Sequence, residues 1–218
     1  ACSTENAYRR KLDACLSFFG SMGVSASVLH EFGKTPTATQ IEHELGAAAL
    51  VYTIGGNTPH LLKTLRSHGT DIALTQAIRS GKPHAGTSAG AMLPFQIMHS
   101  NISARPALET WDYHFLPGLG VVNGTIAVHA EQHDPTIHGA RPDSRLEHLI
   151  QNFPATGRYG IAIDNGAAIA LGDENRITTT KDGAQVTLLE RIDPYTINIT
   201  EIDDPSMLDV LKRPVPRL

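Results

Sequence analysis

The sequence predicts an α/β protein, a three-layer doubly wound sandwich with a mostly parallel sheet, in a single domain of 218 residues. Strand-like and helix-like segments alternate through about residue 100, as they do where helices connect parallel strands. Residues 48–54 form a continuous apolar run, which is typical of a strand buried on both faces. The C-terminal part is rich in short strand-like segments, which predicts an antiparallel extension of the sheet.

The elements of the first hundred residues follow from apolar spacing and from the residues that end it. A helix is predicted over 6–22, because apolar residues recur there every three to four positions, and Ser3 or Thr4 would cap it. Thr39 is the expected cap of the next helix. The further elements, in order, are a strand at 24–29, a helix at 37–45, a strand at 48–54, helices at 60–67 and 71–79, a strand at 83–86 and a helix at 89–95.

The second half of the chain contains more strands than helices. Residues 96–120 show no clear period and are predicted to be rich in loops. The other segments have strand-like or amphipathic patterns and, in order, are a strand at 121–128, a helix at 143–153, strands at 159–163 and 167–171, a short strand after residue 175, strands at 185–191 and 196–202, and a helix at 205–211.

Composition excludes several classes of function. The net charge is −4, so the chain has no basic excess to hold a nucleic-acid backbone, and nucleic acid is not an expected partner. No apolar run approaches the length that spans a bilayer, and the first residues lack the apolar core of a signal peptide. Cys2 and Cys15 are the only cysteines, which is too few for a disulfide framework. We therefore expect a cytoplasmic protein with no membrane partner.

The segment from Gly86 to Gly90 matches the pattern G-x-S-x-G, with Ser88 at its centre. This pattern is typical of a nucleophile on a sharp strand-to-helix turn, where both neighbouring glycines let the strand and the helix pass closely. An apolar strand is predicted before it and a helix after it, as that turn requires. The competing interpretation is a glycine-rich turn whose serine has no chemical role. We favour Ser88 as a catalytic nucleophile.

Acyl transfer to a serine also requires two N–H groups directed at the oxyanion. The backbone N–H of Ala89 is the expected first donor, because it opens the helix that follows Ser88. Gly55 or Gly56, in the turn after the preceding parallel strand, would supply the second donor, since glycine lets a backbone approach a substrate closely. An ordinary tight turn is the alternative explanation for this glycine pair.

Among eleven histidines, His129 has the position expected of a general base. It follows a predicted strand, and ligand crevices of open α/β sheets lie at the carboxyl ends of the strands. Serine triads occur in several chain orders, so a histidine after the serine is compatible with one.

A metal site is the alternative for the same segment. His129, Glu131 and His133 could form part of a metal-dependent hydrolase, with the two histidines four residues apart. The segment lacks the H-E-x-x-H order, because Glu131 comes two residues after the first histidine, and Pro135 makes a helix there doubtful. Surface histidines are the plainer explanation for His133 and His138. Sensitivity to a chelator would separate the metal site from the triad.

Five motifs in order resemble the peptidase E family, which includes aspartyl dipeptidase and cyanophycinase. They are Ile54-Gly55-Gly56-Asn57-Thr58 with His60-Leu61-Leu62, Gly86-Thr87-Ser88-Ala89-Gly90-Ala91, Leu116-Pro117-Gly118-Leu119-Gly120, the strand ending at His129, and Gly160-Ile161-Ala162-Ile163-Asp164. The resemblance runs from about residue 48 to 171. It implies a fold like that of class I glutamine amidotransferases and a Ser-His-Glu triad, with Ser88 as nucleophile and His129 as base.

The third member of the implied triad departs from the family. The family's glutamate position falls on Asn165 in this sequence, and Asp164 precedes it. An asparagine can orient an imidazole, as it does in Cys-His-Asn peptidases, but it cannot offset the imidazolium charge. Asp164 could do both if the turn directs it inward, and Glu109 is a third candidate.

The resemblance also bears on substrate and on the start of the chain. Aspartyl dipeptidase binds its acidic substrate residue through a basic side chain after the histidine, and Arg141 and Arg145 lie in that region. Either guanidinium could bind a carboxylate, although surface charges before the helix at 143–153 are an equal alternative. Family members begin with a hydrophobic strand, whereas this sequence begins with a polar loop and a helix, so one central strand is unaccounted for.

Together these observations predict a serine peptidase that hydrolyses dipeptides or short peptides, with Asp-X dipeptides as one candidate substrate. Its partner is a small peptide, and no metal or organic cofactor is expected. The alternatives are the metal-dependent hydrolase and a non-catalytic binding protein of the same fold, which would show no covalent labelling of Ser88. The sequence leaves the oligomeric state open, with a homodimer as one option.

Overall fold

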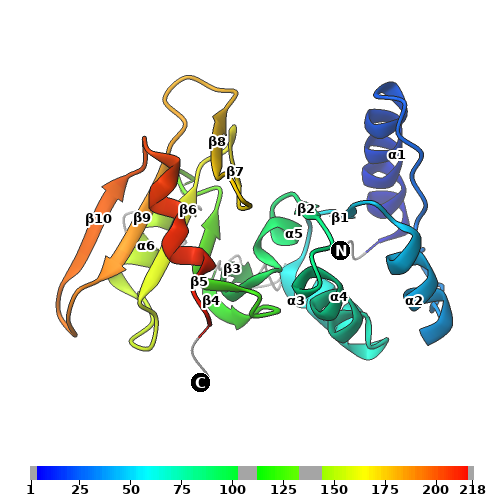
Figure 1. The fold of residues 1–218 in the computed structure, drawn as a ribbon, viewed down its shortest axis with the longest axis horizontal. Helices are drawn as coiled ribbons and strands as arrows, with labels where there is room; N and C mark the ends of the chain where they lie inside the picture. The colour runs from blue at the N-terminus through cyan, green and yellow to red at the C-terminus, as the bar shows by residue number, and fades with distance from the viewer. Residues whose placement is uncertain (1–3, 103–111, 133–143, 216–218) are drawn as a thin grey trace. The chain divides into compact units, whose positions relative to one another are not determined.

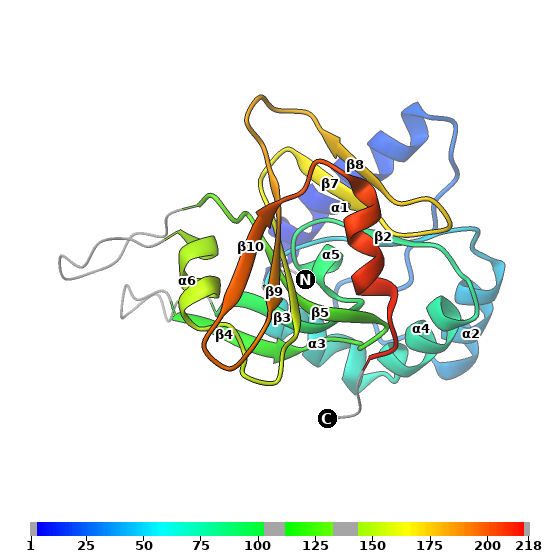
Figure 2. The same ribbon diagram turned by 60° about the vertical axis from the view of Figure 1, so that its left-hand side comes forward.

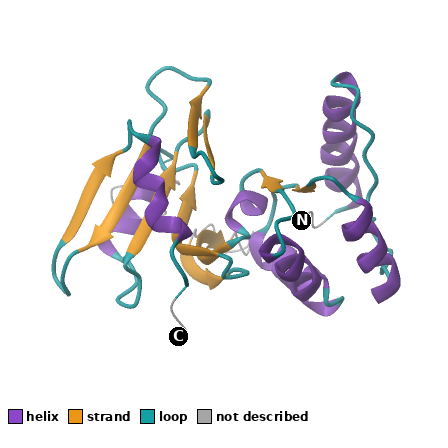
Figure 3. Ribbon diagram, viewed as in Figure 1, coloured by secondary structure: helices purple, strands orange, loops and turns teal. Residues whose placement is uncertain are grey.

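The computed structural model describes residues 4–102, 112–132 and 144–215. The chain groups into two compact units, Ala1–Ala91 and Met92–Leu218, which we describe separately (Figure 1). Figure 3 shows that most helices belong to the first unit and most strands to the second. Within the described ranges, no helix combines the length and the apolar character needed to cross a membrane. The α/β class is as the sequence predicts, whereas a single domain stays a prediction.

The N-terminal unit contains two short parallel strands and the helices that follow the chain around them. Its elements are α1 (Glu5–Ser21), α2 (Ala38–Ala47), β1 (Val51–Thr53), α3 (Thr58–Ser67), α4 (Thr70–Arg79), β2 (His84–Gly86) and the start of α5 (Ala89–Met92). Strands β1 and β2 pair in parallel, with Thr53 opposite Gly86. The carboxyl ends of both strands therefore lie at one edge of this small sheet, and they carry the Gly55 and Ser88 turns.

Two predictions in this unit are wrong. Residues 24–29 form no strand, and Val24 is 48% exposed, because no neighbouring strand covers the short alternating pattern there. Thr37 caps α2 instead of Thr39: its hydroxyl accepts from the Gln40 N–H at 3.2 Å, and the Gln40 side chain accepts from the Thr37 N–H at 2.8 Å. This reciprocal pair is a capping box, which satisfies two N–H groups that the helix start leaves open. Thr4 caps α1, as one of the two predicted candidates.

The C-terminal unit is built on one six-stranded sheet. Its elements are β3 (Phe95–Ile102), β4 (Asp112–Pro117), β5 (Val122–Val128), α6 (Arg145–Gln151), β6 (Tyr159–Ile163), β7 (Ala167–Ala170), β8 (Arg176–Thr179), β9 (Val186–Arg191), β10 (Ile197–Glu201) and the 3-10 helix η1 (Pro205–Lys212). The strand order is β10-β9-β6-β5-β3-β4, and β7 pairs separately with β8. The central strands β3, β5 and β6 are parallel, and β9 and β10 add the predicted antiparallel extension.

Strands β3 and β4 correct the prediction of a loop-rich region after residue 95. Strand β3 buries His99 and Ser100 completely, so its inward side chains do not form an apolar pattern that the sequence could reveal. The predicted helix at 89–95 is also too long, because α5 ends at Met92. Pro94 explains this end, since a residue before proline is driven out of the helical region.

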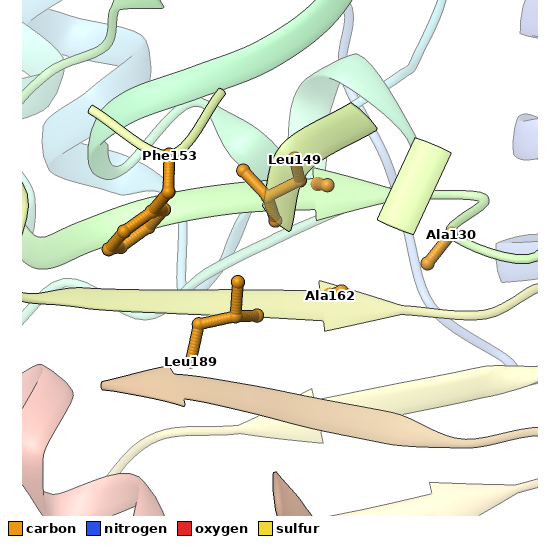
Figure 4. Packing of buried hydrophobic residues seen from close by; sticks show 6 residues of the cluster. Ala130, Leu149, Phe153, Ala162 and Leu189 are labelled. Carbon is orange, nitrogen blue, oxygen red and sulfur yellow. The ribbon is translucent and has the colours of Figure 1, made fainter. Parts of the chain in front are cut away.

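A compact apolar core fixes α6 on one face of this sheet. Its members are Ala127, Ala130, Leu149, Phe153, Ala162 and Leu189, all at most 6% exposed. Figure 4 shows Leu149 and Phe153 above the strands that carry Ala162 and Leu189. Gly160 makes room for the ring, because an added Cβ would lie 2.6 Å from Cε2 of Phe153. Helix η1 contacts β5 from the other face, which gives this unit three layers (Figures 1 and 2).

His99 is a fully buried histidine on β3. Its Nε2 lies 3.0 Å from Nδ1 of His148, and its ring stacks on Tyr113 with 4.9 Å between ring centroids. Burial lowers the pKa of His99 to about 3, with further lowering by the nearby positive charges of His148 and Arg145. The folded protein therefore holds this imidazole in its neutral form.

We expect His99 to make the protein sensitive to acid. The unfolded chain binds the proton near pH 6.5, and the folded chain only near pH 3, so the free energy of unfolding should fall as the pH drops between these values. The loss should be about 2 kcal/mol between pH 8 and pH 5. Urea unfolding at both pH values checks this, with His99→Gln expected to reduce the difference by about 2 kcal/mol. Part of the difference should remain, because burial also lowers the pKa of His84 to about 4. His43→Gln, at an exposed histidine, should leave it unchanged; an unaltered difference in His99→Gln would contradict the prediction.

Candidate active site

Ser88 occupies a sharp turn between β2 and α5. Its backbone has φ 52°, in the left-handed region that residues with a side chain rarely adopt. The turn is closed by hydrogen bonds from the N–H of Gly90 to the Thr87 carbonyl at 2.9 Å and from the N–H of Ala91 to the Ser88 carbonyl at 3.0 Å. A left-handed conformation costs about 1–2 kcal/mol for such a residue, so the surrounding structure must hold Ser88 there.

The glycines on either side of Ser88 are required by close backbone contacts. A Cβ at Gly86 would lie 2.5 Å from the carbonyl carbon of Gly90, and a Cβ at Gly90 would lie 2.0 Å from the carbonyl oxygen of Thr53. Real Cβ atoms essentially never approach backbone so closely. The strand, the turn and the helix start therefore pass one another as the G-x-S-x-G pattern predicts.

The Gly55 turn lies directly against the Ser88 turn. An added Cβ at Gly55 would lie 2.5 Å from the Thr87 carbonyl oxygen and 2.7 Å from Cβ of Ser88. The Gly55 N–H donates to the Thr87 hydroxyl over 3.4 Å, a long hydrogen bond. The structure thus brings Gly55 to the predicted nucleophile, together with Ala89, which opens α5. The roles of Gly55, Gly56 and Ala89 as oxyanion donors stay predictions.

A pocket of about 340 Å³ opens beside Ser88 within the N-terminal unit. Its walls are mostly apolar and come from α1, β1 and the two turns: Lys11, Ala14, Cys15, Phe18, Tyr52, Ile54, Gly55, Thr87 and Ser88. Lys11 adds one ammonium group, which donates to the Gly55 carbonyl at 3.3 Å. Sequence reasoning missed this pocket, because the apolar stripe of α1 predicts a helix without showing which surface it faces.

His129 lies in the C-terminal unit, in the turn that follows β5. Its φ is 57°, again in the left-handed region. The turn is anchored by a hydrogen bond from the Ala130 N–H to the Ile163 carbonyl at 3.1 Å. Strands β5 and β6 are parallel neighbours with Val128 opposite Ile163, so the residues that follow them emerge at the same edge of the sheet.

This edge places Asn165 beside His129. The Asn165 Oδ1 contacts Nδ1 of His129 at hydrogen-bond distance. An amide oxygen only accepts, so Nδ1 must carry the proton and donate it, and Nε2 of the neutral ring becomes an acceptor. That tautomer is the one a general base requires. Of the three candidates for the orienting residue, the structure thus brings Asn165 to the histidine.

The other two candidates for the residue that orients His129 are Asp164 and Glu109. The Asp164 carboxylate accepts from the Gln185 N–H at 3.0 Å, on the neighbouring strand connection, and burial raises its pKa. Glu109 lies outside the described residues. The hydrogen bond of Asp164 therefore goes to the backbone of Gln185, where it helps to hold the turn after β6.

Glu131 is a residue of this site whose contact with Asn165 sequence reasoning missed. Its Oε2 accepts from the backbone N–H of Asn165 at 3.0 Å, and its Oε1 accepts from the Asn165 side-chain amide. Burial alone would raise the pKa of Glu131, but these two hydrogen bonds outweigh it and lower the pKa below its ordinary value. Glu131 is accordingly a carboxylate at neutral pH. The only sequence signal for a role of Glu131 in this site was its position two residues after His129. That position indicated a metal ligand equally well.

Arg145 is 6% exposed and begins α6. Its Nη1 donates to the Val128 carbonyl at 3.2 Å, and its guanidinium lies over the Tyr113 ring, 5.6 Å from the centroid. These contacts hold the end of β5 immediately before His129. The predicted part of Arg145 in substrate binding stays a prediction, and Arg141 lies outside the described residues.

The described residues offer no cluster of three or more His, Cys, Asp or Glu side chains that could hold a metal ion. His129 and Glu131 both direct a side chain to Asn165, while His133 and His138 lie outside the described residues. The arrangement at this edge is therefore a hydrogen-bonded chain from histidine through amide to carboxylate.

Comparisons with known proteins connect these features to a family. The chain matches the family model "Peptidase family S51" over residues 2–179. An "Uncharacterized peptidase PM1590" of Pasteurella multocida (strain Pm70) is 39% identical over 59 residues, which are 27% of this chain and 28% of that protein's length. The chain thus matches under a third of that relative's length.

Two solved structures share the fold. A crystal structure titled "Putative Peptidase E Protein", from Listeria monocytogenes EGD-e, has a TM-score of 0.51 and 22% identity over 78% of this chain and 77% of that one. A peptidase from an acI-B1 Actinobacterium has a TM-score of 0.56 and 19% identity over 93% of this chain and 77% of that one. The fold and the serine turn agree with the family match, and the chain belongs to peptidase family S51.

Proposed function

We propose that the protein hydrolyses dipeptides or short peptides with Ser88 as nucleophile and His129 as general base. One observation carries this proposal: among the described residues, Ser88 and His129 are the only two non-glycine residues with positive φ. Strained backbone of this kind persists where the surrounding structure enforces it, and it gathers at functional sites. Both residues follow the carboxyl end of a parallel strand, where α/β proteins place their ligands.

In the proposed reaction, the Ser88 hydroxyl attacks the scissile carbonyl while Nε2 of His129 accepts its proton. The N–H of Ala89, with that of Gly55 or Gly56, stabilises the oxyanion. The C–N bond then breaks, His129 returns the proton to the leaving amine, and an ester joins the acyl group to Ser88. A water molecule, deprotonated by His129, hydrolyses this ester and restores the free hydroxyl. Asn165 holds His129 in the required tautomer throughout.

The pocket beside Ser88 supports a substrate with an apolar or aromatic side chain next to the scissile bond. Phe18, Tyr52 and Ile54 form apolar walls, and the volume of about 340 Å³ is enough for one large side chain. Lys11 could hold a substrate carboxylate at the pocket's edge. Asp-X dipeptides remain the alternative, because Arg141 and Arg145 would serve that substrate.

A fluorophosphonate probe tests the activated serine directly. We expect one adduct per chain, located on Ser88 by mass spectrometry, and equal labelling in the presence of EDTA. Labelling that EDTA abolishes would move the function to a metal-dependent hydrolase. Folded protein that takes up no probe would contradict the serine mechanism and favour a non-catalytic binding protein. A panel of dipeptides with Phe, Leu, Asp or Lys at the first position would then define the preference.

We also expect Cys15 to control access to the pocket. Replacing Cys15 with tryptophan should fill the space beside Ser88 and lower kcat/KM for substrates with a large apolar side chain by about tenfold or more, since a misfit of this kind costs on the order of 1–3 kcal/mol. Cys15→Ala keeps the pocket open and is the matched control. Steady-state kinetics with a Phe and a Gly substrate check this, because the smaller side chain should lose less. Equal losses for both substrates would place the binding site elsewhere.

A further inference from the structure

We propose that Glu131 is a positioning residue that acts through Asn165 on His129 and supplies the negative charge that the asparagine lacks. This inference rests on the proposed function and adds a fourth member to its catalytic group. The observation behind it is the continuous hydrogen-bonded chain from His129 to Asn165 to Glu131. A serine triad ordinarily ends in a carboxylate in direct contact with the histidine, whereas here an amide separates the two.

The hydrogen-bond chemistry fixes how Asn165 is oriented. Glu131 is a carboxylate and only accepts, so the NH₂ group of Asn165 must face it, and the amide oxygen must then face Nδ1 of His129. The backbone N–H of Asn165 donates to the second oxygen of Glu131 at 3.0 Å. Glu131 therefore holds both the backbone and the side chain of Asn165, which leaves the amide little freedom to rotate.

The hydrogen bonds from His129 through Asn165 to Glu131 also transmit the effect of the Glu131 charge. A hydrogen bond from an amide NH₂ to a carboxylate draws electron density toward the amide oxygen, because neighbouring hydrogen bonds polarise one another. That oxygen is then a better acceptor for the Nδ1 proton of His129, most of all when the ring becomes an imidazolium. An asparagine without a carboxylate behind it would orient the ring but would stabilise its charge less.

The backbone explains why these residues meet. Glu131 belongs to the same turn as His129, after β5, and Asn165 belongs to the turn after β6. A hydrogen bond from the Ala130 N–H to the Ile163 carbonyl connects the two turns. Two charged groups lie near Glu131 on the adjoining segments: Lys181 favours its ionised form, and Asp164 experiences its negative charge.

Replacing Glu131 with glutamine keeps the shape and removes the charge. We expect kcat/KM at pH 7 to fall about tenfold and the acid limb of its pH profile to move to lower pH, because the imidazolium loses a stabilising charge. Glu174→Gln, at an exposed carboxylate with 83% side-chain exposure, is the matched control and should change neither. Unchanged activity and an unchanged acid limb in folded Glu131→Gln protein would overturn the proposal.

A double variant separates charge from packing. Combining Glu131→Gln with Asn165→Asp moves the carboxylate from position 131 to position 165, the position whose side chain contacts His129. We expect it to recover most of the lost kcat/KM and to return the acid limb to that of the unaltered protein. A merely structural role for Glu131 predicts no recovery, and that result would refute the inference even if the single variant failed to fold.

A measurement that does not use peptide hydrolysis keeps this inference distinct from the proposed function. In a Ser88→Ala background, NMR of the His129 imidazole should show a proton on Nδ1, and Glu131→Gln should shift its titration midpoint to lower pH. If the fluorophosphonate adduct fails to form while this shift is present, the serine mechanism is wrong and the link between Glu131 and His129 stands. If the adduct forms and the midpoint is unmoved, the link is wrong.

Discussion

Replacing Ser88 with alanine should reduce kcat/KM by about 10⁴-fold or more, because the nucleophile of a serine triad acts as one unit with its base and has no substitute. Fluorophosphonate labelling should disappear at the same time. Peptide binding, measured by calorimetry, should change little, since the hydroxyl is small and the pocket walls are retained. Residual activity above about one per cent would show that another group performs the attack.

Ser88→Gly tests the strain at the same position. Both variants lack the hydroxyl, but only glycine adopts φ near 52° without steric cost. The left-handed conformation costs alanine about 1–2 kcal/mol, and the greater freedom of glycine in the unfolded chain offsets about 0.5–1 kcal/mol of this.

The free energy of unfolding should consequently be higher for Ser88→Gly than for Ser88→Ala, by up to about 1.5 kcal/mol. Urea unfolding of the two inactive proteins measures it. A lower stability of the glycine variant would show that the turn carries no strain to relieve.

The sequence was informative where backbone sterics dictate the residue. The glycines flanking Ser88 and the glycine at position 55 are required by contacts closer than 3 Å, so the pattern of small residues predicts the turn before the structure is known. Strand β6 was equally visible, because residues buried on both faces form a continuous apolar run. These two signals located Ser88 and the edge that carries His129 and Asn165.

The sequence did not predict the features that depend on tertiary contacts. Nothing local distinguishes the apolar stripe of α1 as the wall of a pocket from a stripe that faces the core. Strand β3 could not be predicted from apolar periodicity, because two of its buried residues, His99 and Ser100, are polar. The contact of Glu131 with Asn165 joins turns 34 residues apart, and only the register of β5 against β6 creates it.

Gly55 is the position at which a single methyl group should have the second-largest effect on activity. Its added Cβ would meet the Thr87 carbonyl oxygen at 2.5 Å and Cβ of Ser88 at 2.7 Å, and neither atom belongs to a flexible side-chain end that could move aside. Gly55→Ala must therefore push the two turns apart. A shift of the nucleophile by a fraction of an ångström to 1 Å is enough to cost on the order of 10²-fold in rate, because the attack geometry is lost.

We expect Gly55→Ala to lower kcat by about 10²-fold and to destabilise the fold by about 1–3 kcal/mol, as overpacking of a tight contact does. Gly46→Ala, in α2, is the matched control: an added Cβ there has no neighbour within 4 Å, and alanine should stabilise the helix by about 0.5–1 kcal/mol with full activity. Kinetics and urea unfolding of both variants check the pair. A fully active Gly55→Ala protein would mean that the Gly55 turn lies farther from the reacting group than the proposed mechanism requires, and the second oxyanion donor would then have to come from another segment.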